Sequence, residues 1–447
     1  MAETLWGRLL LVVLFSALAL RQGLPAVPLG LALAALSLWP ERRRVLVAGA
    51  TACWLLAIRR VDEGWSVPVL LIVFSAAWLG LMLFRKRPDH WLFQRPVRNL
   101  LVLYVALLAA ASYLPLTPWV RVSLWAALVI AGKYLWFMGY ALSDRKGVER
   151  RSPLQTLFHF QPFWGSSNVP LPKGEANLDR IEAKNAGGLA ICQLTGIELM
   201  VWSTLLLGAL GLFDRILEGP WPCNEWLRRI HFPNHVSQLD PAIELYLKGK
   251  PLPRLDCWLA VIANFCRKLL AVSAWGGTII ATCRMAGFNA VRNTRRPLTS
   301  RTIAEFYNRV YYYFKELLVT FFFYPTYFRY FKNRPKLRVF AATLAAAGFG
   351  NALFHFLRNI EFIMQKGLWH ALVDFQVYAI YTLILGVAIA FSQLRSLERH
   401  AQGGRFTGPL CVLIFYCLLM VLDDPRRGWT VRDYFSFMAN LFASFPR

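Results

Sequence analysis

Apolar stretches alternate with short polar, mostly basic segments along the whole chain. The apolar stretches cover approximately residues 5–20, 24–39, 45–58, 67–84, 100–114, 119–142, 188–213, 258–283, 339–357, 368–391 and 410–422. Several are shorter than the roughly 20 residues that cross a bilayer at right angles, so tilt and flanking residues affect the count. The pattern predicts an all-α, polytopic integral membrane protein with about nine to eleven transmembrane helices.

The charges of the short loops predict the orientation of the chain. Basic residues crowd the loops 41–44, 85–98 and 143–151, whereas the loop at 115–118 carries no charge. Because cytoplasmic loops retain Lys and Arg, the basic loops are expected inside and the N-terminus outside. Arg59 and Arg60 in the third loop fit this scheme less well. Continued alternation places residues 214–256 outside and the basic stretches 284–301 and 329–338 inside.

Three regions follow from this pattern. Residues 1–142 hold N-terminal transmembrane helices, 143–187 form a cytoplasmic loop, and 188–447 form a core with an extracytoplasmic loop at 214–256. Within the core, the aromatic-rich segment 302–330 starts and ends on the predicted cytoplasmic side. Such a segment cannot span the bilayer, so it is expected either to lie at the interface or to re-enter as a hairpin buried against protein.

Composition supports the membrane assignment. The chain is 57% hydrophobic and 15% aromatic, above the usual range for soluble domains. Its net charge of +25 would suggest nucleic acid in a soluble protein, but these charges lie in loops between apolar stretches, so we predict a bilayer and no nucleic acid as partner. The eight cysteines include no CxxC pair, and no metal site is predicted.

One of the seven histidines lies inside an apolar helix. His355 follows AATLAAAGFGNALF, whereas the other six lie in polar segments or at helix ends. An ionisable side chain within a membrane helix is a functional candidate. The alternative is a core histidine that bonds to Asn351, one turn earlier on the same face. The residues alone leave both readings open.

The neighbourhood of His355 contains further motif residues. They are Pro297, Ser300, Glu305, Phe306, Tyr307, Arg309, Pro325, Gly348, Gly350 and His355, with a basic turn after Pro325. This order resembles the membrane-bound O-acyltransferase family, in which an aromatic-Arg motif, a basic cytoplasmic turn and a Gly-rich helix precede an essential histidine. The resemblance covers roughly residues 255–391. The N-terminal helices agree only in hydropathy and orientation.

The sequence departs from the family pattern at two places. Val310 and Tyr311 stand where family members commonly have Trp followed by His or Asn, so Asn308 or a tyrosine hydroxyl is left to replace that polar group. The family's Gly-Leu-Trp-His string is altered before His355. A complete copy occurs at residues 367–370, which makes His370 a second candidate.

The resemblance implies acyl transfer from a cytoplasmic thioester, on coenzyme A or an acyl carrier protein, to a hydroxyl of a lipid, glycan or other acceptor. His355 would be the general base, kept neutral by its apolar surroundings, and needs no cofactor beyond the thioester co-substrate. Asn351 or Asn308 would assist it. The residues expected to line the substrate tunnel are Glu305, Phe306, Tyr307, Arg309, Tyr311 and His370. The length and orientation favour a bacterial inner-membrane protein.

Two other functions remain open. A transporter or flippase for a lipid-linked glycan would also be basic, aromatic and rich in helices, but it predicts charges on several helices around one cavity. A non-catalytic membrane scaffold with the same fold is the other alternative. The missing polar residue after Arg309 keeps this second alternative open.

Overall fold

The computed structural model describes residues 3–57, 66–144, 152–159, 162–165, 173–218, 238–398, 407–423, 425 and 428–443. These residues form helices and contain no strand, apart from one isolated bridge between Glu182 and Phe288. The prediction of an all-α polytopic membrane protein is confirmed.

Every predicted apolar stretch is helical. The stretches correspond to α1 (Leu5–Arg21), α2 (Ala26–Leu38), α3 (Arg43–Ala57), α4 (Ser66–Lys86), α6 (Pro96–Tyr113), α7 (Pro118–Ser143), α11 (Ala186–Glu218), α14 (Arg254–Met285), α18 (Pro335–Thr343) with η4 (Leu344–Gly350) and α19 (Asn351–Arg358), α21 (Leu368–Asp374), α22 (Gln376–Glu398) and α23 (Thr407–Leu419). The stretch 368–391 divides into α21 and α22, with a break at Phe375.

Several described helices are long and apolar enough to cross a bilayer. Helix α4 is apolar and has 21 residues. By length and hydropathy together, five further helices among the described residues qualify as spans: α6, α11, α14, the continuous helix Pro335–Arg358 and α22. A sixth is added if the two halves of α7, bent by 57°, count as one span. Helices α1, α2 and α23 have only 17, 13 and 13 residues. These shorter apolar helices would need tilt or flanking residues to cross a bilayer.

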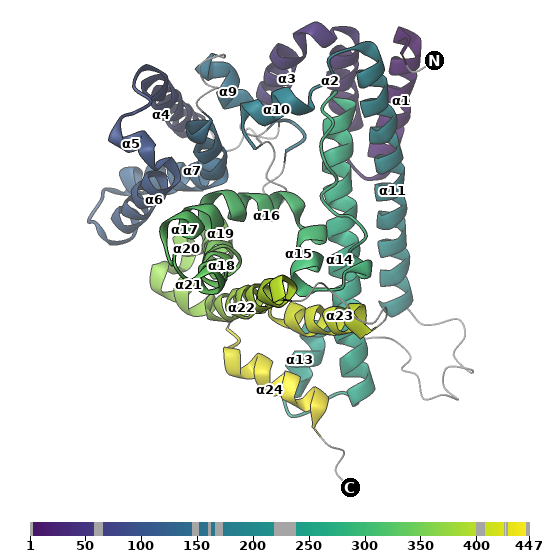
Figure 1. Cartoon of the computed structure of the whole chain (residues 1–447), viewed down its shortest axis with the longest axis vertical. Helices are drawn as coiled ribbons and strands as arrows, with labels where there is room; N and C mark the ends of the chain where they lie inside the picture. The colour runs from purple at the N-terminus through teal and green to yellow at the C-terminus, as the bar shows by residue number, and fades with distance from the viewer. Residues whose placement is uncertain are drawn as a thin grey trace. The chain divides into compact units, whose positions relative to one another are not determined.

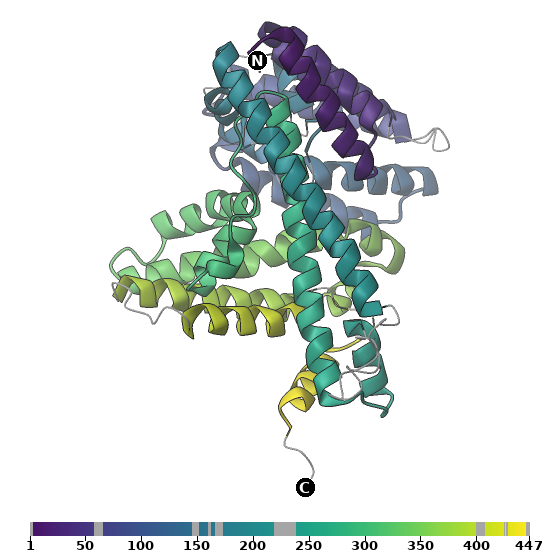
Figure 2. The same cartoon turned by 90° about the vertical axis from the view of Figure 1, so that its right-hand side faces the viewer.

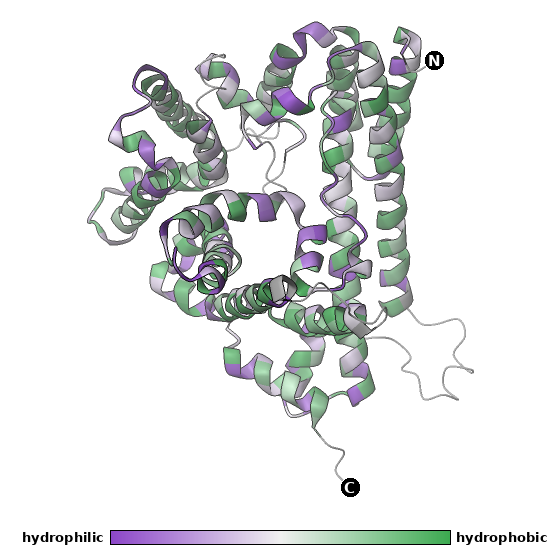
Figure 3. Cartoon of the chain, in the orientation of Figure 1, coloured by the Kyte–Doolittle hydropathy of each residue, from purple (hydrophilic) through white to green (hydrophobic). Residues whose placement is uncertain are grey.

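The chain divides into two compact units that do not follow chain order. Unit 1 contains residues 1–204, 276–292 and 357–368, and unit 2 contains 205–275, 293–356 and 369–447. Two of the boundaries fall inside the long helices α11 and α14, so each of these helices contributes to both units. Figure 3 shows hydrophobic residues along most of α11.

Unit 1 contains two groups of packed helices. Helices α1 and α2 form a hairpin, seen in both views, and α2 packs on α3 (Figures 1 and 2). In the second group, α4 and α6 pack on α7, and the short helices α5 (Trp91–Gln94) and α9 (Pro153–His159) adjoin them. A core of buried side chains joins this group: Leu81, Phe84, Phe137, Met138, Ala141, Leu142 and Leu157.

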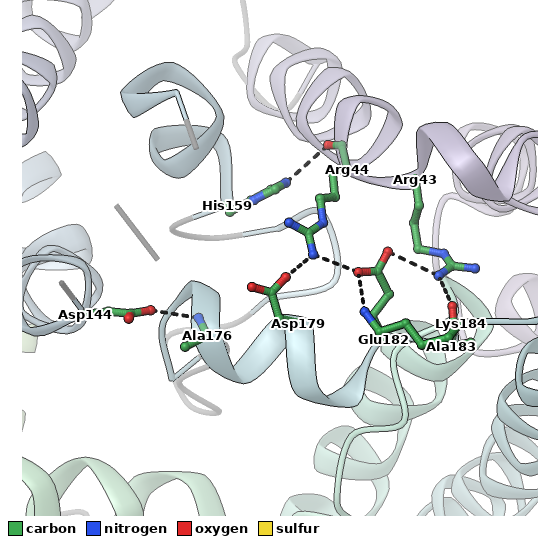
Figure 4. Close-up of polar contacts among 9 residues, drawn as sticks. All are labelled: Arg43, Arg44, Asp144, His159, Ala176, Asp179, Glu182, Ala183 and Lys184. Carbon is green, nitrogen blue, oxygen red and sulfur yellow. Dashed lines mark hydrogen bonds and ion pairs between the residues drawn. The ribbon is translucent and has the colours of Figure 1, made fainter. Parts of the chain in front are cut away.

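A network of charged residues in unit 1 holds α3 to α10 (Glu175–Ile181) (Figure 4). The Arg43 guanidinium donates to the Glu182 carboxylate at 3.3 Å and to the Ala183 carbonyl at 2.9 Å. Arg44 donates to Glu182 at 2.9 Å and also pairs with Asp179. Only 3% of the Arg43 side chain and 12% of the Glu182 side chain are exposed. We call Arg43, Arg44, Asp179 and Glu182 the arginine–carboxylate network.

Backbone geometry makes room for this network. Gly287 has a φ of +91°, and a Cβ at this position would lie 2.7 Å from Nε of Arg43. The Ala183 amide donates to the Gly287 carbonyl at 2.9 Å, and the Arg43 guanidinium lies 5.9 Å from the centre of the Phe288 ring. Only glycine suits both the left-handed backbone and the contact with the guanidinium.

In unit 2, η4 and α18 pack against α22, and so does α15 (Ile303–Val310). The remaining helices include α13 (Leu239–Leu247), α16 (Tyr312–Leu318), α17 (Tyr324–Arg329) and α24 (Val431–Phe442), and α13 packs on α24 (Figure 1). The C-terminal helix α24 starts with a capping box in which Thr430 and Asp433 bond reciprocally. Helix α20 (Ile360–Lys366) belongs to unit 1 and packs on α7.

Candidate functional site

His355 lies on α19 among aromatic rings of unit 2. Its ring centre is 4.7 Å from that of Tyr378 on α22, 5.4 Å from Phe354 and 5.6 Å from Phe314 on α16. The side chain is partly exposed, whereas Phe354, Phe314 and Tyr378 are buried. We call this arrangement the His355 aromatic cage. Three aromatic rings therefore surround the imidazole, while residue His355 as a whole keeps some solvent exposure.

Asn351 precedes His355 by one helical turn and is 2% exposed. Residues four apart on a helix share a face, so its amide and the imidazole lie on the same side of α19. The Asn351 Oδ1 atom is buried and has no hydrogen-bond partner among the described residues. A buried acceptor without a partner is uncommon and calls for an explanation, such as a role in binding or catalysis.

The backbone leading to Asn351 is a π-helical stretch. Both η4 (Leu344–Gly350) and η3 (Val319–Phe323) have π-helical hydrogen bonding, and the two segments contact each other. Such wide turns are rare and occur frequently at functional sites. The π-helical turn in η4 determines the direction of the following helix α19, which carries Asn351 and His355.

The motif glycines allow close packing at this turn. A Cβ on Gly350 would lie 2.7 Å from the Phe322 ring, and a Cβ on Gly386 of α22 would lie 2.8 Å from the backbone nitrogen of Gly348. The second contact would be with backbone atoms of η4, so moving a side chain could not relieve a clash between α22 and η4. The close crossing brings α22, and with it Tyr378, next to the helix that carries His355.

The aromatic segment is a broken helix rather than an extended loop. It comprises α15, α16, η3 and α17, with the first break at Tyr311, whose φ and ψ are −123° and 57°. The side chain of Thr302 caps α15 by accepting from the Glu305 amide at 3.1 Å. Whether this segment re-enters a bilayer or lies on its surface stays a prediction.

Glu305 and Arg309 hold the start of this segment to the preceding turn. Their ion pair measures 2.5 Å, one helical turn apart. Arg309 also donates to the Arg296 carbonyl at 3.0 Å and bonds the Thr299 hydroxyl, while Glu305 accepts from the Arg301 amide at 2.7 Å. Both side chains are about one-third exposed. These contacts give the motif Arg a structural role in positioning α15.

The aromatic residues of the motif point into unit 2. Phe306 is fully buried and stacks on Tyr416 of α23, with ring centres 4.0 Å apart. Tyr307 and Tyr311 lie 5.7 Å apart. The Tyr307 hydroxyl is buried without a hydrogen-bond partner among the described residues, the same condition as the Asn351 oxygen.

Two residues that the sequence analysis proposed for the site are not buried. Asn308 on α15 and His370 on α21 are both exposed. Neither belongs to the His355 aromatic cage, whose rings come from α16, α19 and α22. Of the predicted site, the structure therefore joins His355 with Asn351 on one helix face and groups Glu305 with Arg309 in a separate ion pair.

The sequence analysis did not single out Tyr378, Tyr381, Lys268 and Asp423. The rings of Tyr378 and Tyr381 lie 5.0 Å apart, one turn along α22, so they extend the cage beyond His355. Lys268 of α14 pairs with Asp423 at 3.2 Å. A charged residue in the middle of the apolar helix α14 was the sequence signal for Lys268.

In the basic stretches 284–301 and 329–338, some side chains already make other contacts, so only part of each stretch is available to bind an anion. Arg292 pairs with Glu198 at 2.8 Å, and the Arg338 guanidinium lies 3.8 Å from the centre of the Tyr327 ring. The side chains of Arg329, Lys332 and Arg334 are exposed. If a phosphate group binds the stretch 329–338, these three exposed side chains can contact it.

Among the described residues, no three His, Cys, Asp or Glu side chains are grouped as metal ligands. No family model matches the chain, and no curated protein matches it significantly. The acyltransferase resemblance therefore stays a prediction that rests on its motif residues.

Proposed function

We propose that the protein is a membrane O-acyltransferase that moves an acyl group from a thioester to a hydroxyl acceptor, with His355 as general base. The observation that supports this most is the partly exposed imidazole in an aromatic cage, one turn from the unpartnered carbonyl oxygen of Asn351. An imidazole that stays neutral in apolar surroundings can accept the proton of an attacking hydroxyl.

The proposed reaction requires few groups. The acceptor oxygen attacks the thioester carbonyl while its proton passes to the His355 ring, and collapse of the tetrahedral intermediate expels the thiolate, which takes up that proton. Asn351 has an amide nitrogen that can donate to a developing oxyanion, or an oxygen that can orient the acceptor hydroxyl. Thioester donors on coenzyme A or an acyl carrier protein would use exposed basic residues such as Arg334.

The test is thiol release by the purified full-length protein. Radiolabelled acetyl and long-chain acyl-coenzyme A are supplied with a membrane lipid and glycan extract, and both free thiol and label transfer are measured. His355→Ala is expected to lower the rate about 10²- to 10⁴-fold, the usual contribution of a general base. His370→Ala, at an exposed histidine, is the matched control and is expected to retain activity.

Three outcomes would contradict the proposal. Full activity in His355→Ala together with loss in His370→Ala would move the site to α21. Movement of a labelled lipid-linked glycan across vesicles without thiol release would identify a transporter, and neither activity would leave a scaffold.

A further inference from the structure

Unit 1 contains an apolar cavity of about 590 Å³ between α4, α6 and α7. Its size lies within the roughly 300–1,000 Å³ of small-molecule sites. Small residues repeated at four-residue spacing, Ala76 and Gly80 on α4 and Ala127 and Ala131 on α7, create the space. The wall contains no charged side chain, and the hydroxyl of Tyr104 is already bonded to the Leu128 carbonyl at 3.0 Å.

The cavity is partly open, and several of its lining residues are both exposed and apolar. Ile72 on α4 and Leu103 on α6 both line it, and they are 66% and 55% exposed. An apolar hollow with apolar rims suits a hydrocarbon chain, since each buried methylene contributes favourably and the wall offers no polar partner.

One end of the cavity adjoins a basic segment. At this end, the lining residues Leu83, Phe93 and Asn99 come from the C-terminal turns of α4, from α5 and from the first turn of α6. This end adjoins five exposed basic residues, and Asp89 is the single acidic residue between positions 85 and 98. The basic residues are Arg85, Lys86, Arg87, Arg95 and Arg98.

Asn99 links the apolar wall to this basic cluster. Its amide nitrogen donates to the Leu92 carbonyl at 2.8 Å, and its oxygen accepts from the Arg98 guanidinium at 3.1 Å. The second bond holds Arg98 at the rim of the cavity. The N-terminus of the 18-residue helix α6 starts at Pro96, beside Arg95, and adds the partial positive charge of its unpaired amides.

We propose that this cavity is a binding site for an anionic glycerophospholipid. One acyl chain lies between α4, α6 and α7, and the phosphate lies against Arg95, Arg98 and the start of α6. The apolar wall determines that the ligand is a lipid, and the charge at one end determines that its headgroup is anionic. The proposal is independent of acyl transfer at His355.

Dioleoyl phosphatidylglycerol and dioleoyl phosphatidylcholine are titrated into the purified full-length protein, and bound lipid is counted by native mass spectrometry. The wild type is expected to retain phosphatidylglycerol preferentially. Arg95→Gln combined with Arg98→Gln should weaken phosphatidylglycerol binding roughly tenfold to thirtyfold and leave phosphatidylcholine unchanged. Arg121→Gln removes an exposed arginine of α7 outside the lining and is expected to change nothing.

Ala131→Phe tests the other half of the site, because a larger side chain fills the hollow and should reduce binding of both lipids. Equal binding of the two lipids by the wild type would overturn the proposal, as would a loss in Arg121→Gln equal to that of the double variant. Unchanged binding in a folded Ala131→Phe protein would show that the acyl chain lies elsewhere. If Ala131→Phe does not fold, the surface arginine pair decides the question alone.

Discussion

Buried polar groups are treated differently in two regions of the molecule. In the arginine–carboxylate network of unit 1, Glu182 accepts from both Arg43 and Arg44, so the carboxylate is paired on both oxygens, although the buried Nε of Arg43 has no hydrogen-bond partner among the described residues. Around His355 in unit 2, Asn351 and Tyr307 each bury an oxygen that has no hydrogen-bond partner among the described residues. Both regions are largely closed to solvent, so burial alone does not explain the difference.

The comparison distinguishes polar residues that stabilise the fold from polar residues that serve a function. A buried charge that finds its partners fixes the position of its helix, and its loss is costly because the remaining charge stays buried. A buried acceptor left unpaired lowers stability, and proteins keep such groups mostly where a ligand or reaction uses them. We therefore expect mutations in the network to act on unfolding and mutations near His355 to act on activity.

The largest effect is expected from Glu182→Gln. This change leaves Arg43 and Arg44 without their carboxylate, and breaking one side of a buried pair typically costs about 3–5 kcal/mol. Thermal unfolding in detergent should show a strongly lowered midpoint. The double variant Arg43→Met with Glu182→Leu removes both charges and should recover much of the loss. A Glu182→Gln protein as stable as the wild type would show that the network contributes nothing.

Gly386→Ala is expected to have the next largest effect. Its methyl group would lie 2.8 Å from the Gly348 nitrogen, so η4 and α22 must separate, at a typical cost of about 1–3 kcal/mol. Gly208→Ala on α11 is the matched control, because nothing lies within 4 Å of the added atom. Replacing a helical glycine without a clash stabilises by roughly 0.5–1 kcal/mol. Equal unfolding midpoints for the two variants would contradict the close crossing.

The helices were predictable from the sequence and their bends were not. Hydrophobicity located every described apolar helix because burial in lipid or protein selects the same residues. It did not predict the bend of 57° in α7, which falls at Lys133, between Gly132 and Tyr134. It also missed the π-helical turns η3 and η4, which depend on the close contacts of Gly350 and Gly386 with other segments.

The candidate site was predictable only where residues are neighbours along one helix. His355 and Asn351 share a face of α19, and Glu305 pairs with Arg309 one turn away, so sequence spacing grouped each pair. Tyr378 lies 23 positions beyond His355 on another helix, and only the fold brings their rings to 4.7 Å. The arginine–carboxylate network was missed for the same reason, because Arg43 and Glu182 come from distant segments.

The network also predicts a dependence of stability on pH. Burial alone would raise the pKa of Glu182, but the nearby Arg44, Arg43 and Lys184 hold this pKa below its ordinary value of 4.5. The carboxylate therefore stabilises the folded state above that ordinary value, and the contribution is lost as the pH falls through the folded-state pKa. The unfolding midpoint should drop below about pH 4.5, and less steeply in Glu182→Gln. Parallel pH curves for the two proteins would show that other carboxylates cause the drop.

Of these substitutions, Asn351→Leu is expected to change stability least. It therefore tests most directly whether the surroundings of His355 differ from the arginine–carboxylate network. Because the buried oxygen of Asn351 accepts no hydrogen bond from the part of the chain that the structure describes, an apolar side chain of similar volume should cost less than about 1 kcal/mol or even stabilise the helix. If the oxygen serves the reaction at His355, thiol release should fall while the unfolding midpoint stays unchanged. Asn351→Asp tests the same position, since a charge there lacks a partner and should lower stability. A large loss of stability in Asn351→Leu would mean that this amide is a structural group, and the two regions would then follow the same rule.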